Sequence, residues 1–209
     1  MPLIYALAVV QMLIFVGITY GLARAFGLAP RVIALGLPAV VRVRKARPEV
    51  RIGILPTASV ELAGEDIVDG QRVTYSGLSR TKRAAIVLVP WVAILAIAIG
   101  CIGVASALRS FARGVPQMLF TVDVTPLVRR MIAIADDAPV VATGILFAKL
   151  VAMNLLPLGG LAGGMLIMQL ATPAGQDVPS GVMKFMTITM FAWMLWALGR
   201  LVYAIVQLV

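Results

Sequence analysis

Lys149 and Asn154 are the two side chains of this 209-residue chain best suited to chemistry inside an apolar stretch. Asn154 begins the sequence Asn-Leu-Leu-Pro, which ends at Pro157 and is followed by Gly-Gly pairs at 159–160 and 163–164. Because proline removes a backbone donor and breaks a helix, Asn154 can hydrogen bond to unwound backbone, in its own chain or on a partner. A lysine such as Lys149 is rare within a membrane segment and usually marks a functional site.

Composition indicates that these residues lie in an integral membrane protein. Hydrophobic residues make up 61% of the chain, charged residues make up 13%, and the mean hydropathy is +1.02, whereas soluble domains are about 45–50% apolar. Continuous apolar runs predict an all-α polytopic membrane fold, as a single membrane domain over residues 1–209. About four transmembrane helices are predicted, at about 3–23, 84–108, 140–171 and 182–209, the third of them broken at Asn154–Pro157.

The distribution of charge predicts how the chain is oriented. The formal net charge is +9, and the segment from Arg24 to Arg83 contains eleven Lys or Arg and five Asp or Glu. Basic residues concentrated in one short loop between spans indicate that this loop is cytoplasmic, so both termini are expected outside. A nucleic-acid surface is the weaker alternative, because the aromatic residues that single-strand binders place among their basic ones are missing.

Two segments outside the spans are predicted to be ordered. Residues 39–62 contain Val-Val-Arg-Val-Arg, Val-Arg-Ile-Gly-Ile-Leu and Ser-Val-Glu-Leu, whose alternation is typical of strands. A small membrane-associated β-hairpin or meander is therefore expected there, with a turn at 45–49. In the outer loop, Thr125 and Pro126 are predicted to be the N-cap and first residue of an amphipathic interfacial helix over 125–136.

Four segments together resemble the site-2 protease family of intramembrane zinc metalloproteases. Asn154-Leu-Leu-Pro157 followed by Leu161-Ala162-Gly163-Gly164 is similar to that family's Asn-x-x-Pro and Leu-Asp-Gly signature. Residues 21–40 are similar to the segment after its first catalytic helix, 51–62 to its membrane-associated β-segment, and 79–96 to the basic start of its second core helix. The similarity covers most of the chain in the family's order. It implies a multi-pass protein of the bacterial inner membrane.

The chemical groups of that family are missing from this chain. The family's zinc is held by the two His of His-Glu-x-x-His and by the Asp of Leu-Asp-Gly, and the Glu is the general base. Matching the Ala-Arg pair at 23–24 puts the first motif at Phe15 to Thr19, and Ala162 stands where the Asp would be. The chain has no His and no acid before Glu49. The resemblance therefore implies a pseudo-protease rather than an enzyme, with no catalytic residue, no metal site and no cofactor.

A scaffold kept without its catalytic groups suggests that its shape is used. We expect a non-catalytic accessory subunit, adaptor or assembly factor of a larger membrane complex. It would bind another integral membrane protein through a single transmembrane helix or an extended strand. Anionic lipid is the expected partner of the cytoplasmic basic loop, and nucleic acid is not expected. The residues expected to contact a polypeptide partner are Ile52 and Ile54 on a strand edge, with Lys149, Asn154, Pro157, Gly160 and Ala162 in the broken span.

Lys149 is the residue whose placement is most informative. It lies about nine residues, or about 14 Å, into its span, near the middle of the membrane. On a helix Lys149 and Asn154 differ by a net rotation of about 140°, so they are expected on different sides. Lys149 is expected either to reach an internal water pocket or to pair with a carboxylate on another protein. Two other functions remain open, namely a metalloprotease completed by a partner's ligands and a transport or channel component that uses Lys149.

Overall fold

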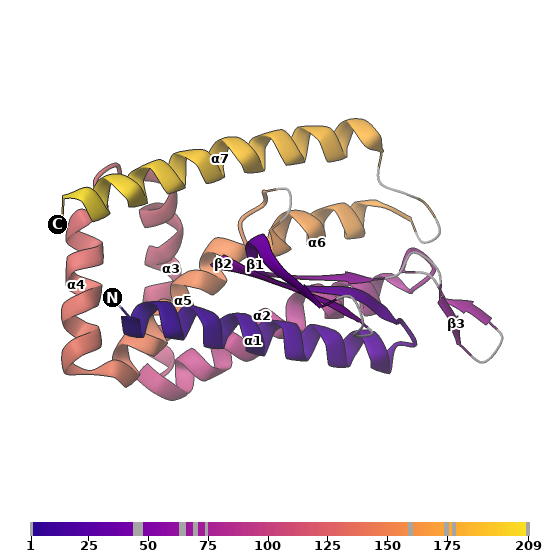
Figure 1. Ribbon diagram of the computed structural model, residues 1–209, viewed down its shortest axis with the longest axis horizontal. Coiled ribbons are helices and arrows are strands. Elements are labelled where there is room, and N and C mark those ends of the chain that lie inside the picture. The colour runs from indigo at the N-terminus through magenta and orange to yellow at the C-terminus, as the bar shows by residue number, and fades with distance from the viewer. Residues whose placement is uncertain are drawn as a thin grey trace.

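The computed structural model describes residues 2–43, 48–62, 66–68, 71–73, 75–158, 161–173, 176 and 179–207, and most of them are helical (Figure 1). The helices are α1 (Pro2–Ala25), α2 (Arg80–Ile102), α3 (Val104–Phe120), α4 (Thr125–Asp137), α5 (Pro139–Asn154), α6 (Ala162–Ala171) and α7 (Ser180–Val206). Three of them are long and apolar enough to cross a membrane, over Leu3–Ala25, Arg80–Ile102 and Ser180–Ala204.

The helix predicted over 84–108 ends earlier in the structure. Ser79 caps the first turn of α2 by accepting the N–H of Lys82 at 3.4 Å, and Pro90 lies inside the helix without ending it. At Gly103 the backbone takes a φ of +75°, which glycine adopts without steric cost. The chain then continues as α3 in a new direction (Figure 1). Apolar composition continues past Gly103, and for that reason hydropathy alone placed the end of the helix too late.

The third apolar stretch is broken where the sequence predicts a break. α5 ends at Asn154 and α6 begins at Ala162, and both helices are shorter than the roughly 20 residues of a single crossing. The Asn154 side chain donates from Nδ2 to the Leu150 carbonyl at 2.9 Å. Asn154 therefore satisfies a carbonyl of its own helix at the point where the regular hydrogen bonds stop.

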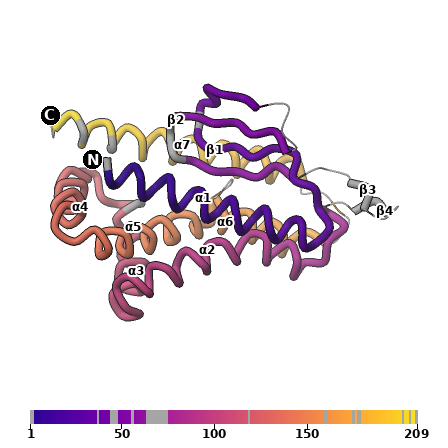
Figure 2. Tube along the Cα trace, turned by 60° about the horizontal axis from the view of Figure 1, so that its bottom comes forward, coloured from indigo at the N-terminus to yellow at the C-terminus, as the bar shows by residue number. Residues whose placement is uncertain are grey.

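Two long strands, β1 (Pro30–Val43) and β2 (Glu49–Leu62), form a sheet in which the two halves of each strand make different pairings. The first half of β1 pairs antiparallel with the second half of β2, and the second half of β1 pairs antiparallel with the first half of β2. Residues 32–35 also pair with 49–52, and both sets of numbers rise together, so these segments run parallel. The segments therefore lie in the order 58–62, 30–35, 49–52, 41–43, and the sheet extends along α1 (Figure 2).

β1 can reach both sides of β2 because the two strands cross at Gly36 and Gly53. The φ of Gly36 is +102°, and a Cβ built on Gly53 would lie 2.4 Å from the Gly36 carbonyl carbon and 2.4 Å from the Pro38 oxygen. No side chain fits at so close a backbone approach, so the crossing requires glycine. A second pair of short strands, β3 (Asp66–Val68) and β4 (Gln71–Val73), follows the sheet.

The predicted β-segment was right in kind and wrong in extent and topology. The strands begin at Pro30 and not at 39, and the sequences Val-Arg-Ile-Gly-Ile-Leu and Ser-Val-Glu-Leu are the two halves of β2. The double pairing is neither a hairpin nor a meander. Most of the turn predicted at 45–49 lies outside the described residues.

A helix is observed over the segment predicted at 125–136, as the amphipathic helix α4 with a different N-cap. Val124 is the N-cap, and Thr125 already belongs to the helix. The Asp123 carboxylate accepts the N–H of Thr125 at 2.9 Å. The N-cap predicted at Thr125 is therefore wrong by one residue, because a carboxylate two positions earlier satisfies the first free backbone donor.

The buried core forms where α2, α3, α5 and α6 meet. Its main cluster consists of Trp91, Ile94, Ala98, Ala107, Phe147, Ala148, Val151 and Ala162. Phe15 of α1 packs against this cluster. The long C-terminal helix α7 instead makes its main contacts with α4, and the Arg200 guanidinium donates to the Thr121 carbonyl. The elements that surround the core are therefore α1, α2, α3, α5 and α6.

Candidate functional site

A cavity of about 400 Å³, here called the central cavity, opens where α1, α2, β2 and α6 meet. This volume falls within the range of about 300–1,000 Å³ that ligand pockets occupy. Its lining residues are Phe15, Thr19, Ala58, Ser59, Val60, Leu62, Tyr75, Ile86, Val87, Trp91, Asn154, Ala162 and Met165. Most of these side chains are apolar, so the cavity is suited to an apolar or backbone-rich ligand.

Three of the lining residues are the positions to which the resemblance assigns zinc ligands. Phe15 and Thr19 stand where the two His of His-Glu-x-x-His would be, and Ala162 stands where the Asp of Leu-Asp-Gly would be. Phe15 and Thr19 are four residues apart, so they lie one above the other on a single face of α1. The fold therefore brings Ala162 to the same cavity as Phe15 and Thr19, although more than half of the chain length separates it from them.

The side chains present at these positions offer no metal ligand of the family's kind. Phe15 and Ala162 are hydrocarbon, and the Thr19 hydroxyl donates to the Phe15 carbonyl at 2.7 Å within α1. Among the described residues, no three of His, Cys, Asp and Glu lie close enough together to hold a metal ion. Phe15 instead packs on Trp91 of α2, with ring centroids 4.9 Å apart and planes tilted by 35°. An aromatic pair thus occupies part of the wall.

The polar groups of the cavity come from different elements. Asn154 lies at the broken end of α5, Ser59 lies on β2, and Tyr75 lies in the turn before α2. The Tyr75 hydroxyl accepts a hydrogen bond from Nε2 of Gln169, a buried residue of α6. Burial raises the pKa of Tyr75 to about 12, although the positive charge of Arg83 and the hydrogen bond from Gln169 act in the opposite direction. Tyr75 is therefore a neutral phenol at physiological pH.

The cavity runs beside the second half of β2. Ala58, Ser59, Val60 and Leu62 all line it, and this part of β2 pairs with the first half of β1 on its other side. Within the described strands it has no partner on the cavity side, so it is an edge of the sheet. Its backbone N–H and C=O groups are free to pair with an added strand.

The strand edge predicted at Ile52 and Ile54 is not free at Ile52. Ile52 pairs with Leu35 on one side and with Val41 on the other, so this part of β2 is inside the sheet. The Ile52 and Ile54 side chains are 43% and 63% exposed, and neither lines the central cavity. The prediction failed at Ile52 because the strands cross at Gly36 and Gly53, so the second half of β1 pairs with the side of β2 that was expected to be free.

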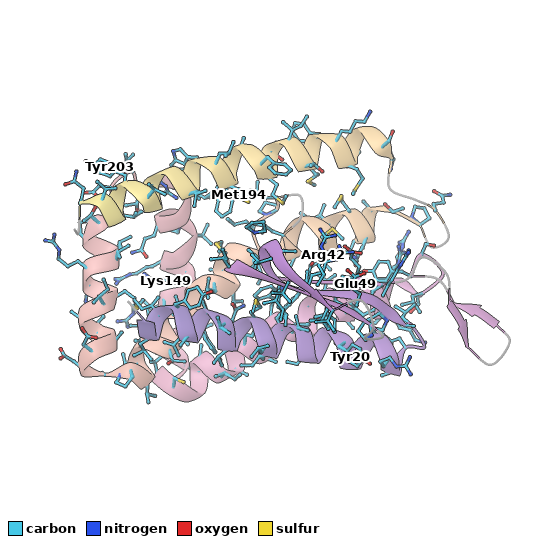
Figure 3. The ribbon with its side chains drawn as sticks, in the orientation of Figure 1. Tyr20, Arg42, Glu49, Lys149, Met194 and Tyr203 are labelled. Carbon is cyan, nitrogen blue, oxygen red and sulfur yellow. The ribbon has the colours of Figure 1, made fainter. Side chains whose placement is uncertain are left out.

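The other predicted contact residues are divided between places. Asn154 and Ala162 line the central cavity, and Pro157 is exposed in the break after α5. Gly160 lies outside the described residues. Lys149 lines a second, smaller cavity between α3, α4 and α5. In Figure 3 it lies at the α3–α4 end of the molecule, away from Arg42 and Glu49 of the sheet.

Reasoning from the sequence missed most of the lining residues, Tyr75, Trp91 and Met165 among them. Tyr75, Trp91 and Met165 line the central cavity, and only Trp91 stood in a segment that the resemblance singled out. No sequence pattern pointed to Tyr75 as a site residue, because the turn that contains it belongs to no segment with helical or strand periodicity. Met165 is one helical turn after Ala162, so a shared face with Ala162 on α6 was the available clue.

The raised pKa of Tyr75 predicts a loss of stability at high pH. Because the folded pKa of about 12 exceeds the ordinary value of 10.0, stability from this phenol is complete below pH 10 and is lost as the pH rises towards 12. The loss is expected to be about 2 kcal/mol. Thermal unfolding of the detergent-solubilised protein from pH 9 to 12 measures it. Tyr75→Phe is expected to flatten this part of the profile, and an unchanged slope would contradict the assignment to Tyr75.

Comparisons of the chain with protein-family models, with curated proteins and with solved structures give no match. What the central cavity can do therefore follows from its own residues. It combines an apolar wall, an aromatic pair, a few neutral polar groups and a free strand edge, which together suit binding of an extended polypeptide.

Proposed function

We propose that this chain is a non-catalytic, site-2-protease-like membrane protein that binds an extended segment of another membrane polypeptide in the central cavity. In this role it is an accessory subunit, adaptor or assembly factor of a larger complex. The observation that carries the proposal is the convergence of Phe15, Thr19 and Ala162 on one cavity. The resemblance selects these positions from sequence order alone, and a chance match gives no reason for them to meet in space.

The free edge of β2 supports an extended occupant. Ala58, Ser59, Val60 and Leu62 place a run of backbone along the cavity, and an added strand would gain hydrogen bonds from it whatever its side chains are. The break between α5 and α6 supports the same occupant, because Asn154 holds the end of α5 beside this edge. Binding by backbone pairing suits a partner whose side chains are mostly apolar.

The side chains of the cavity support binding without catalysis. A metalloprotease of this kind needs a metal-activated water and a general base, and the chain contains no His at all. The wall carries hydrocarbon at Phe15 and Ala162, and the Thr19 hydroxyl is used within its own helix. We therefore assign the chain no cofactor and class it as a pseudo-protease.

The proposed setting is the bacterial inner membrane. α1, α2 and α7 supply three crossings, and α5 and α6 together supply a broken fourth. The basic segment from Arg24 to Arg83 then lies in the cytoplasm, where it meets anionic lipid, and both termini lie outside. Protease accessibility of terminal tags in spheroplasts and in inverted vesicles tests this orientation.

A photoreactive amino acid at Ser59 tests the proposed occupant. The tagged protein is irradiated in native membranes, purified in mild detergent, and its adducts are identified by mass spectrometry. A membrane polypeptide cross-linked from Ser59 but not from Ile54 is expected, since Ser59 lines the cavity and Ile54 does not. Adducts of equal yield from both positions, or from neither, would contradict docking at this edge.

Filling the cavity is expected to release the partner. Ala162 is 9% exposed, so Ala162→Leu places three more carbons in the cavity and costs a bound segment about 1–3 kcal/mol of overpacking. Recovery of the partner identified from Ser59 is expected to fall about tenfold, as quantified by mass spectrometry. Ala133→Leu, on the exposed face of α4, is the matched control and is expected to leave recovery unchanged. Equal recovery with both variants would rule out the cavity as the docking site.

A further inference from the structure

The second cavity, of about 150 Å³, is lined by three cationic side chains from three different helices. They are Arg113 of α3, Arg130 of α4 and Lys149 of α5. Among the residues that line this cavity there is no carboxylate, and no described carboxylate lies within 4.0 Å of any of the three cations. We call this arrangement the cationic cavity.

The spacing along each helix explains why these side chains meet. Ser110, Arg113 and Gln117 follow each other at intervals of three and four residues, so they share one face of α3. Leu127, Arg130, Met131 and Ile134 share a face of α4 in the same way, and Ile145 and Lys149 share a face of α5. The turn at Gly103 sends α3 back along α5, and this brings the three faces together.

Lys149 is held in place but keeps hydrogen-bonding capacity. Its Nζ donates to Oε1 of Gln117 at 2.7 Å, which uses one of the three N–H donors of an ammonium. No other hydrogen-bond partner of Nζ exists within the described part of the chain. Arg113 and Arg130 are close enough to Lys149 for their charges to repel it. Arg113 and Arg130 are exposed and Lys149 is half-buried, so an anion that enters the cavity is attracted by all three cations and relieves the repulsion felt by Lys149.

We infer that the cationic cavity binds the phosphate of an anionic phospholipid headgroup. A phosphate carries negative charge and several acceptor oxygens, which guanidinium groups and an ammonium bind well. The rest of the lining is apolar and comes from Leu127, Met131, Ile134 and Ile145. A phospholipid has both parts, since its headgroup meets the cations while its glycerol and acyl carbons meet the apolar wall.

The surroundings favour a lipid over a soluble phosphate or a protein carboxylate. α3 and α4 are amphipathic, and α3 also carries exposed large apolar side chains, including Leu108 and Phe120. Such helices lie in the interface of a bilayer, at the depth of the phosphates. In this arrangement Lys149 lies nearer the headgroups than the middle of the membrane that its position in the sequence suggested. A partner's carboxylate would meet the cations but would leave the apolar wall of Leu127, Met131 and Ile134 without a matching group. The site is separate from the central cavity and does not depend on it.

Native mass spectrometry of the full chain in uncharged detergent tests this inference. The protein is titrated with phosphatidylglycerol or with phosphatidylcholine of the same acyl chains. One phosphatidylglycerol per chain is expected, bound about tenfold more tightly than phosphatidylcholine, because the site needs net negative charge. Equal binding of both lipids would overturn the inference. Displacement by millimolar inorganic phosphate would assign the site to a soluble phosphate and equally overturn it.

Variants locate the lipid and separate binding from folding. Arg113→Gln, Arg130→Gln and Lys149→Met are each expected to weaken phosphatidylglycerol binding about tenfold. Arg129→Gln is the matched control, because Arg129 is exposed like its neighbour Arg130 but does not line the cavity. Without lipid, the thermal midpoint of each cavity variant is expected to stay level or rise, since one repulsion is removed. The inference is overturned if Arg129→Gln weakens binding as much as Arg130→Gln. It is also overturned if Lys149→Met releases an acidic membrane protein while lipid binding is unchanged.

Discussion

Phe15→His, Thr19→His and Ala162→Asp together are expected to turn the central cavity into a zinc site. The two His would lie four residues apart on one face of α1, as in a helical His-Glu-x-x-His motif, and the Asp would enter from the start of α6. Three protein ligands and a water complete the coordination of a catalytic-type zinc. We expect about one zinc per chain after gel filtration, measured by elemental mass spectrometry. Saturation at a hundredfold excess over the dissociation constant is expected to stabilise the fold by about 2.7 kcal/mol.

A control variant introduces the same two His and one Asp but moves one His off the face of α1 that lines the cavity. In Phe15→His, Ile18→His and Ala162→Asp, the second His leaves the face of α1 that lines the cavity, because Ile18 is not a lining residue. This variant is expected to retain no zinc above background. Zinc in neither triple variant would remove the geometric support for the resemblance. Zinc in the unmodified protein, purified without chelators, would favour the alternative of a metalloprotease that completes its site with another chain.

Gly53→Ala is expected to be the most destabilising single substitution in the sheet. Its new Cβ would lie 2.4 Å from backbone atoms of Gly36 and Pro38, and neither strand can move aside without losing its pairing. Overpacking of backbone against backbone places the cost at about 3 kcal/mol or more. The expected result is a lower thermal midpoint in detergent and faster cleavage by trypsin after Arg42 and Arg51.

Gly21→Ala is the matched control for this substitution. No atom lies within 4 Å of a Cβ built on Gly21, which is in the helix α1. An alanine there is expected to stabilise the helix by about 0.5–1 kcal/mol, which is the opposite sign. Equal midpoints for the two variants would show that the strands do not cross at Gly53. Because the free edge of β2 belongs to the same sheet, Gly53→Ala is also expected to reduce cross-linking from Ser59.

Apolar patterning predicted the helices well because it depends on local sequence. The runs that contain α1, α2 and α7 are evident in the chain, and the break after Asn154 follows from Pro157 and the glycines beyond it. The end of α2 was missed because the residues after Gly103 are still apolar. A single positive φ redirects the chain there without a change in composition.

The sheet was harder to predict because its pairing is not local. Alternation identified parts of both strands, but it carries no information about which segment lies beside which. The crossing at Gly36 and Gly53 decides that, and it moved the free edge from Ile52 to the second half of β2. Pairing between distant segments depends on the whole arrangement, and a two-residue periodicity does not encode it.

One feature of the two cavities could be predicted from the sequence, and another could not. The net rotation of about 140° between Lys149 and Asn154 predicted different sides of the helix, and the two residues do line different cavities. The approach of Arg113 and Arg130 to Lys149 could not be predicted, since it depends on α3 turning back at Gly103. Of the two environments expected for Lys149, the described residues provide an internal cavity.

The last helix, α7, contributes no described residue to the walls of the two cavities. Every residue that lines either cavity lies between Phe15 and Met165, while α7 rests mainly on α4 and is held there by Arg200 and Thr121. α7 nevertheless packs on α4, which forms part of the wall of the cationic cavity. A change in α7 can therefore reach the cationic cavity through α4, whereas no described residue of α4 or α7 forms a wall of the central cavity.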